Sequence, residues 1–141
     1  MTQEENKELL FIDLCSRLPY HVRLKIWLKD GTTEEGFLDL EHNYADVLRD
    51  AFYYNKIIDI KPYLRPLSSM TEEERYEIQE ILGKDIEIFD DFISIIDSSR
   101  KRFSFLELQA LLNWLNAHHF DYRRLIEKNL ALDCTRLHIY D

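Results

Sequence analysis

Residues 22–28 alternate apolar and polar side chains, and this pattern restricts the fold more than any other stretch of the chain. Apolar residues occupy every second position from Val22 to Leu28. A period of two is that of a β-strand with one buried face. The pair Asp30-Gly31, typical of tight hairpin turns, follows, and residues 36–41 read as a second strand. The sequence therefore predicts an antiparallel hairpin near its start.

Before this hairpin the apolar period is that of a helix. Leu10, Leu14 and Leu18 are spaced by four residues, which places them on one face of a helix over residues 5–18. Pro19 has no amide hydrogen to continue the helix, so the helix is expected to end there.

After the hairpin, residues 46–52 and 56–60 are predicted to form two further short strands. Pro62 and Pro66 follow them. Because proline cannot donate to a strand ladder, we place both at the edge or exit of the sheet and not in a central strand. Residues 1–69 are thus expected to combine an N-terminal helix with a small, bent antiparallel sheet.

The second half of the chain carries two helix-start signals. Thr71 with Glu74, and Ser104 with Glu107, each match a Ser/Thr-x-x-Glu capping box. The first helix is expected to close at Gly83, which readily adopts the left-handed conformation found at helix ends. The helix after Ser104 has the strongest helical spacing in the chain.

Two segments of this half are less regular. Residues 85–97 favour a hairpin that turns at Asp90-Asp91, and a short helix from Asp91 is the alternative. Asp121 is expected to cap a turn over residues 122–128, with Asn129 left-handed at its end. The predicted fold is α+β, with a mainly helical half (70–141) packed on the helix and sheet of residues 1–69.

The net charge of −9 over 141 residues is unevenly distributed. Residues 71–99 hold ten acidic side chains against two basic ones, a local charge of −8. An acidic chain repels the phosphate backbone of a nucleic acid, and non-specific duplex binding requires a clustered basic face. Arg100-Lys101-Arg102 is the only basic run, and three residues are too few to predict duplex binding.

The sequence also predicts the compartment. The segment MTQEENKELL has no basic stretch before an apolar run, and no stretch approaches the roughly eighteen apolar residues of a membrane span. Cys15 and Cys134 form no CxxC pair, which favours buried thiols over a disulfide. We expect a cytoplasmic protein without a membrane partner.

Two longer motifs carry a resemblance. The segments IKPYLRPLSSMTEEE (residues 60–74) and LNAHHFDYRRLIEKNLAL (residues 115–132) resemble an uncharacterised family of small proteins of gut bacteria and their phages and prophages. That family usually has glycine where this chain has Arg124 and Asn129, and a different tail. The resemblance implies an intracellular, mobile-element context and no particular reaction.

The first 69 residues also resemble the layout of SH3 or Sm-like small barrels, in which a helix precedes a strongly bent five-stranded sheet. Sm-like proteins bind single-stranded RNA. At the corresponding positions this chain has Glu41 for an aspartate, Tyr44 for a methionine, Ala45 for the base-contacting asparagine and Lys61-Pro62 for an Arg-Gly pair. The resemblance implies a small barrel, without the amide that reads the base.

Two adjacent histidines, His118 and His119, are the most conspicuous candidates for chemistry. Neighbouring helical residues diverge by roughly 100°, whereas helical zinc ligands are spaced by three or four. Asp121 could reach His118, but no third ligand is in view. We therefore expect His118 at a helix C-terminus, where a cation is favoured, and His119 as a continuation of the apolar stripe.

The sequence contains no phosphate-binding loop, nucleophile elbow or dinucleotide fingerprint. We expect that the protein is not an enzyme and binds neither a cofactor nor a metal. We expect instead an accessory protein that acts through a protein partner or self-association. A single-stranded nucleic-acid binder is the alternative. The aromatic and basic residues proposed as the partner or nucleic-acid surface are Trp27, Tyr44, Lys61, Arg65, Arg123 and Arg124.

Overall fold

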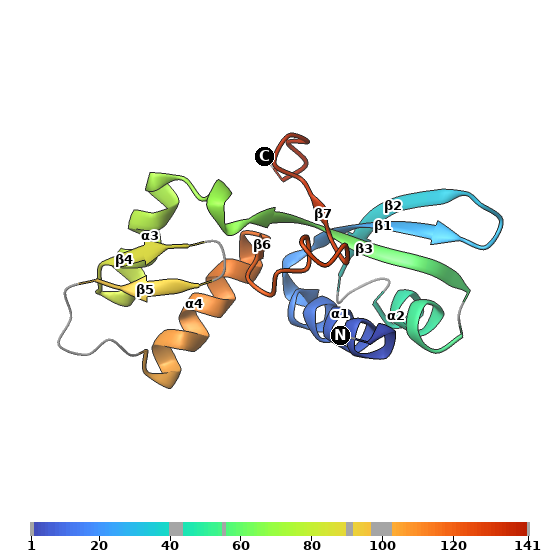
Figure 1. Cartoon of the computed structure of the whole chain (residues 1–141), viewed down its shortest axis with the longest axis horizontal. Coiled ribbons are helices and arrows are strands. Elements are labelled where there is room, and N and C mark those ends of the chain that lie inside the picture. The colour runs from blue at the N-terminus through green and yellow to red at the C-terminus, as the bar shows by residue number, and fades with distance from the viewer. Residues whose placement is uncertain (1, 40–43, 55, 90–91, 97–102, 141) are drawn as a thin grey trace.

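The computed structural model describes residues 2–39, 44–54, 56–89, 92–96 and 103–140. Figure 1 shows two lobes: one holds α1, α2 and the long strands, and the other holds α3, α4 and a small hairpin. The chain is α+β, with an N-terminal helix followed by strands, as the sequence predicts.

The N-terminal helix α1 (Gln3–Ser16) starts from a capping box that the sequence reading missed. The Thr2 hydroxyl accepts from the Glu5 amide, and the Glu5 carboxylate accepts from the Thr2 amide. The helix ends two residues before its predicted end because Leu18–Tyr20, which contains Pro19, forms a 3-10 turn (η1).

The predicted hairpin is confirmed. Strands β1 (Val22–Leu28) and β2 (Thr33–Leu38) pair antiparallel, with Val22 opposite Leu38 and Trp27 opposite Thr33. Gly31 supplies the positive φ of the turn. β2 begins three residues before its predicted start, and positions 40 and 41 of the predicted strand fall outside the described residues.

The strand predicted over residues 46–52 is wrong, because this segment forms helix α2 (Tyr44–Phe52). Its apolar residues are spaced as on a helix: Leu48 and Ala51 are buried, and Phe52 packs against the same core. The side chains of Arg49 and Asp46, three residues apart, also form an ion pair along the helix. Short apolar runs do not distinguish the two states.

The placement of Pro62 outside the central strand is also wrong, whereas Pro66 is the last residue of β3, at the exit of the strand. β3 (Ile57–Pro66) pairs with β1 on one side and with β6 (Phe120–Asp121) and β7 (Leu132–Asp133) further along. The Ile60 amide donates to the Asp59 side chain, so the backbone N–H of Ile60 points away from β1. Every second residue of a strand directs its backbone nitrogen to the same side, so the nitrogen of Pro62 also faces away from β1. The missing N–H of proline therefore removes no hydrogen bond from the β1–β3 ladder.

The strand order of the larger sheet is β2-β1-β3-β6, with β7 also on β3. The antiparallel arrangement holds for β1 to β3, whereas β6 and β7 join parallel to β3. Within the described residues the order is an open path and not the closed ring of a small barrel.

The second lobe follows its predicted signals closely. Capping boxes at Thr71 and Ser104 start α3 (Glu72–Leu82) and α4 (Phe105–Ala117), and Gly83 closes α3 with a φ of 65°. The favoured hairpin is present as β4 (Ile86–Ile88) paired with β5 (Ile93–Ile95). Its predicted turn at Asp90-Asp91 lies outside the described residues.

Two apolar cores support the lobes. The first is formed by α1, α2 and β1 to β3, and it also includes Leu125 and Ala131. The second joins Leu67 after β3 to Trp114 and other side chains of α3, β4 and α4. The chain after Phe120 therefore returns to the first lobe, and contacts between the two segments predicted as halves are extensive.

Candidate functional site

Two of the six proposed surface residues, Trp27 and Lys61, meet on the outer face of the sheet. Lys61 Nζ lies 5.6 Å from the centroid of the Trp27 ring, and Lys25 Nζ lies 5.4 Å from it. These are cation–π distances. Lys25 was not among the proposed residues, although the alternation of the strand places it on the same face as Trp27 and could have identified it.

Lys61 is largely engaged within the chain. Its ammonium group donates to Asn129 Oδ1 at 3.0 Å and lies 3.9 Å from a carboxylate oxygen of Asp59. Its side chain is only 13% exposed. A ligand on this face would therefore meet mainly the Trp27 ring and Lys25.

Arg65 lies apart from Trp27 and forms a bidentate ion pair. Its guanidinium donates to both carboxylate oxygens of Glu74, at 2.7 and 2.8 Å, and stands over the Phe120 ring at 4.2 Å. Burial raises the pKa of Glu74, but hydrogen bonds from Arg65 and Thr71 outweigh it and lower that pKa overall. Arg65 therefore joins β3 to α3.

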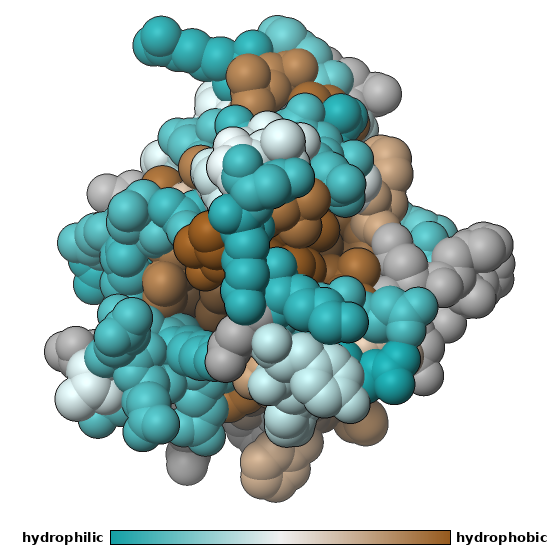
Figure 2. Space-filling view, turned by 90° about the vertical axis from the view of Figure 1, so that its right-hand side faces the viewer, coloured by the Kyte–Doolittle hydropathy of each residue, from teal (hydrophilic) through white to brown (hydrophobic). Residues whose placement is uncertain are grey.

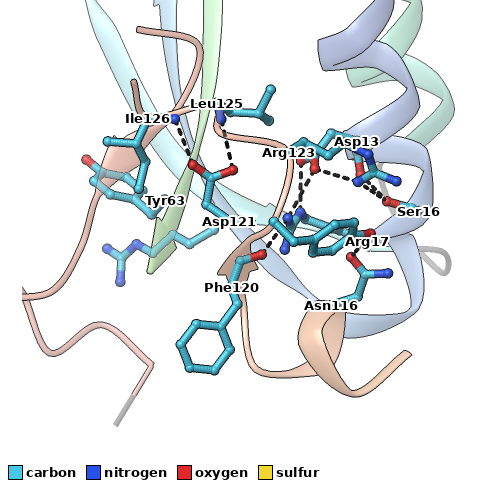
Figure 3. Close-up of polar contacts among 12 residues, drawn as sticks. Asp13, Ser16, Arg17, Tyr63, Asn116, Phe120, Asp121, Arg123, Leu125 and Ile126 are labelled. Atoms are coloured by element: carbon cyan, nitrogen blue, oxygen red, sulfur yellow. Dashed lines mark hydrogen bonds and ion pairs between the residues drawn. The ribbon is translucent and has the colours of Figure 1, made fainter. Parts of the chain in front are cut away.

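Arg123 belongs to a buried polar cluster between α1 and the segment after α4 (Figure 3). The Asp13 carboxylate accepts from Arg17 Nε at 2.8 Å and from Arg123 Nη1 at 2.7 Å. Arg17 Nη2 also donates to the Phe120 carbonyl at 2.8 Å. Asp13 and Arg17 are fully buried, whereas the Arg123 side chain is 20% exposed. The cluster therefore ties α1 to the segment after α4, and its carboxylate is out of reach of a ligand.

The remaining two proposed residues do not add to the Trp27 face. Arg124 is exposed, adopts a left-handed φ of 60° and pairs with Glu127. Tyr44 is the first residue of α2, and its side chain lies outside the described part of the structure. The six residues therefore form one cluster of two and several separate positions.

The adjacent histidines His118 and His119 follow α4 and have different conformations. His118 is the C-cap residue, as expected, and its ring stacks on Trp114 at 3.9 Å. The expectation for His119 is wrong: it has a left-handed φ of 64°, lies outside the helix and stacks on Tyr140 at 3.6 Å. Asp121 caps the following turn, as expected, by accepting from the Leu125 and Ile126 amides.

His119 has a strongly perturbed pKa. Burial, followed by electrostatic interactions with Arg17, His118 and Arg65, lowers the pKa of the His119 imidazole to about 4. Among the residues that the structure describes, no three His, Cys, Asp or Glu side chains are grouped as metal ligands.

A groove of about 360 Å³ lies at the other end of the first lobe, between α1, α2 and the start of β3. We call it the α1–α2 groove. It is lined by Gln3, Asn6, Lys7, Leu10, Ala51, Phe52, Ile57, Ile58, Asp59, Ile60 and Leu130. A shallower hollow lined by Glu4, Glu8, Phe11 and Tyr53 adjoins it and shares Lys7 and Phe52.

Large apolar side chains around this groove face solvent. Tyr53, Tyr54 and Ile58 are 70%, 60% and 65% exposed. Figure 2 looks onto the end of the molecule that carries α2 and the β1–β2 turn, and it shows hydrophobic side chains between hydrophilic ones. Sequence reasoning missed this groove because it expected residues 46–52 to be a strand.

Comparison with known proteins finds no match among family models, curated proteins or solved structures. No helix in the described part of the chain has both the length and the apolar character needed to span a bilayer.

Proposed function

We propose that this protein is a non-enzymatic accessory protein that acts in the cytoplasm by docking a protein partner in the α1–α2 groove. The exposure of Ile58, which lines the groove, and of Tyr53, which lines the adjoining hollow, carries the proposal. Aromatic and aliphatic side chains that remain in water next to a concave surface are typical of interaction sites. The resemblance of residues 60–74 and 115–132 to a family of small gut-bacterial, phage and prophage proteins is the basis for proposing an origin in a mobile element.

Site-specific photo-crosslinking tests the docking surface. A photoreactive phenylalanine analogue replaces Tyr53 in one variant and Tyr76, which is 55% exposed on α3, in a matched control. We expect a discrete crosslinked partner from position 53 in cells of the source organism. Ile58→Ser in the same chain should remove it. Equal crosslinking from position 76 would contradict the proposal.

Self-association is the second form of this proposal. If the groove joins two copies of the chain, sedimentation equilibrium should show a dimer that Ile58→Ser dissociates, and the crosslinked product should have twice the mass of the chain. A different product mass together with a monomeric chain identifies a heterologous partner.

A single-stranded nucleic-acid binder is the alternative function. The observation that favours it is the Trp27 ring with the ammonium groups of Lys25 and Lys61 near it on an open sheet face. An aromatic ring among basic side chains is the usual platform for an unpaired base. The engagement of Arg65 by Glu74 weakens this alternative, because it removes one expected phosphate contact.

A further inference from the structure

We propose that the occupant of the α1–α2 groove is an amphipathic helix with lysine or arginine on its polar face. This inference rests on the proposed function and adds the chemistry of the partner. It combines the shape of the groove, the charge of its rim and the state of the adjacent strand edge.

Apolar side chains in the floor of the groove favour contact with apolar side chains of the partner. Leu10, Ala51, Ile57 and Leu130 line it from four different segments of the chain. Phe52 stands between this groove and the adjoining hollow, held by an edge-to-face contact with Phe11 at 5.1 Å. Two adjoining hollows beside one aromatic ring suit apolar side chains spaced by a helical turn.

Acidic side chains at the rim of the groove favour a basic partner. Glu4 and Glu8, four residues apart on α1, line the adjoining hollow, and Asp59 lines the groove. Neither Glu4 nor Glu8 forms an ion pair within the described residues. Lys7 is the only basic side chain lining the two hollows among those residues, which leaves an acidic excess.

The same charges argue against a second copy of this chain as the occupant, because two such rims would bring like charges together.

The edge of β3 beside the groove argues for a helix over an added strand. Strand addition needs free backbone donors along an edge. Here Pro62 has no amide hydrogen, and the Ile60 amide already donates to Asp59 Oδ1 at 2.9 Å. The ladder with β1 is also irregular at Trp27 and Leu28. These features are the usual protection of an edge against a further strand.

Three labelled synthetic helices of one length test the inference on the full chain by fluorescence anisotropy. The first has leucines on one face and lysines on the other, the second has glutamates in place of the lysines, and the third scrambles the first. We expect the lysine helix to bind about tenfold more tightly than either of the others, a difference of about 1.4 kcal/mol.

Two matched pairs of variants locate the binding. Ile58→Ser should weaken the lysine helix about fivefold or more, whereas Ile12→Ser, at a 49% exposed position of α1 outside the groove lining, should leave it within about twofold. The double change Glu4→Lys and Glu8→Lys should abolish the preference for lysine. Glu73→Lys with Glu77→Lys, an equally spaced pair on α3, makes the same change in net charge and should preserve it.

Equal binding of the scrambled helix, or equal effects within either matched pair, would overturn the inference. If the glutamate helix binds at the groove instead, docking stands and the proposed partner chemistry is wrong. If no helix binds and crosslinking at position 53 still traps a partner, the helical occupant is wrong. If both experiments fail, the proposed function fails with them.

Discussion

The Tyr140 hydroxyl accepts the backbone amide of Arg23 at 2.8 Å, across 117 residues of sequence. The same hydroxyl donates to the Tyr63 carbonyl at 2.7 Å. Arg23 and Tyr63 would form the next rung of the β1–β3 ladder, whose last pair is Leu24 with Pro62. The hydroxyl therefore takes the place of a backbone hydrogen bond, and burial, the main cause, raises the pKa of Tyr140.

Tyr140→Phe should consequently destabilise the chain by about 1–3 kcal/mol, because it leaves a part-buried amide and a carbonyl without a partner. Urea unfolding measures the loss, and hydrogen exchange should show faster exchange at the Arg23 amide. Tyr54→Phe, at a 60% exposed position, is the control and should change stability by less than about 0.5 kcal/mol. Equal stability of both variants would show that the bridge is not formed.

His119 should make stability depend on pH in the acidic range. Its pKa is about 4 in the folded chain, against its usual 6.5, so the unfolded chain binds the proton more readily. The stabilisation is complete above pH 6.5 and is lost as the pH falls towards 4. After discounting for partial exposure, we expect a loss on the order of 2 kcal/mol.

His119→Asn tests this effect, because asparagine tolerates the left-handed backbone at this position. The difference in unfolding free energy between the two proteins should change between pH 6.5 and 4 and be constant above that window. An imidazole titration by NMR with a midpoint near 6.5 in the folded protein would disprove the assignment.

Asp13 neutralises two guanidinium groups, and its removal should be costly. Asp13→Asn leaves Arg17 and Arg123 without their carboxylate in a buried site. Breaking a buried ion pair in this way costs about 3–5 kcal/mol. Asp59→Asn, which removes a half-exposed carboxylate 3.9 Å from Lys61, should cost less than about 1 kcal/mol. Urea unfolding of both variants provides the comparison, and similar losses would contradict the structural role of Asp13.

The features that were predictable from the sequence are those set by neighbouring residues. The capping boxes at Thr71 and Ser104, the left-handed closure at Gly83 and the alternation in β1 each involve positions a few residues apart, and each is present. The helix α2 was mistaken for a strand because its apolar run is short, and the tertiary contacts of Leu48 and Ala51 decide its state.

The candidate site was harder to predict because its contacts are distant in sequence. The groove brings together α1, α2, β3 and Leu130, and no local pattern predicts that meeting. Arg65 and Arg123 were proposed as surface charges, yet their partners Glu74 and Asp13 lie nine and 110 residues away. The contact between Trp27 and Lys61 is easier to predict, because each residue lies on a strand whose alternation shows which face its side chain occupies.

The Trp27 face should bind unpaired nucleic acid only weakly. Stacking of one base is worth about 1–3 kcal/mol, but the chain carries a net charge of −9 and Glu74 holds Arg65 away from phosphate. We therefore expect no binding of random single strands tighter than about 10 μM at physiological salt. Fluorescence anisotropy with uridine-rich and mixed oligonucleotides, at two salt concentrations, measures this. Sub-micromolar binding that Trp27→Ala abolishes, and that Tyr76→Ala on α3 leaves intact, would favour the nucleic-acid function over protein docking.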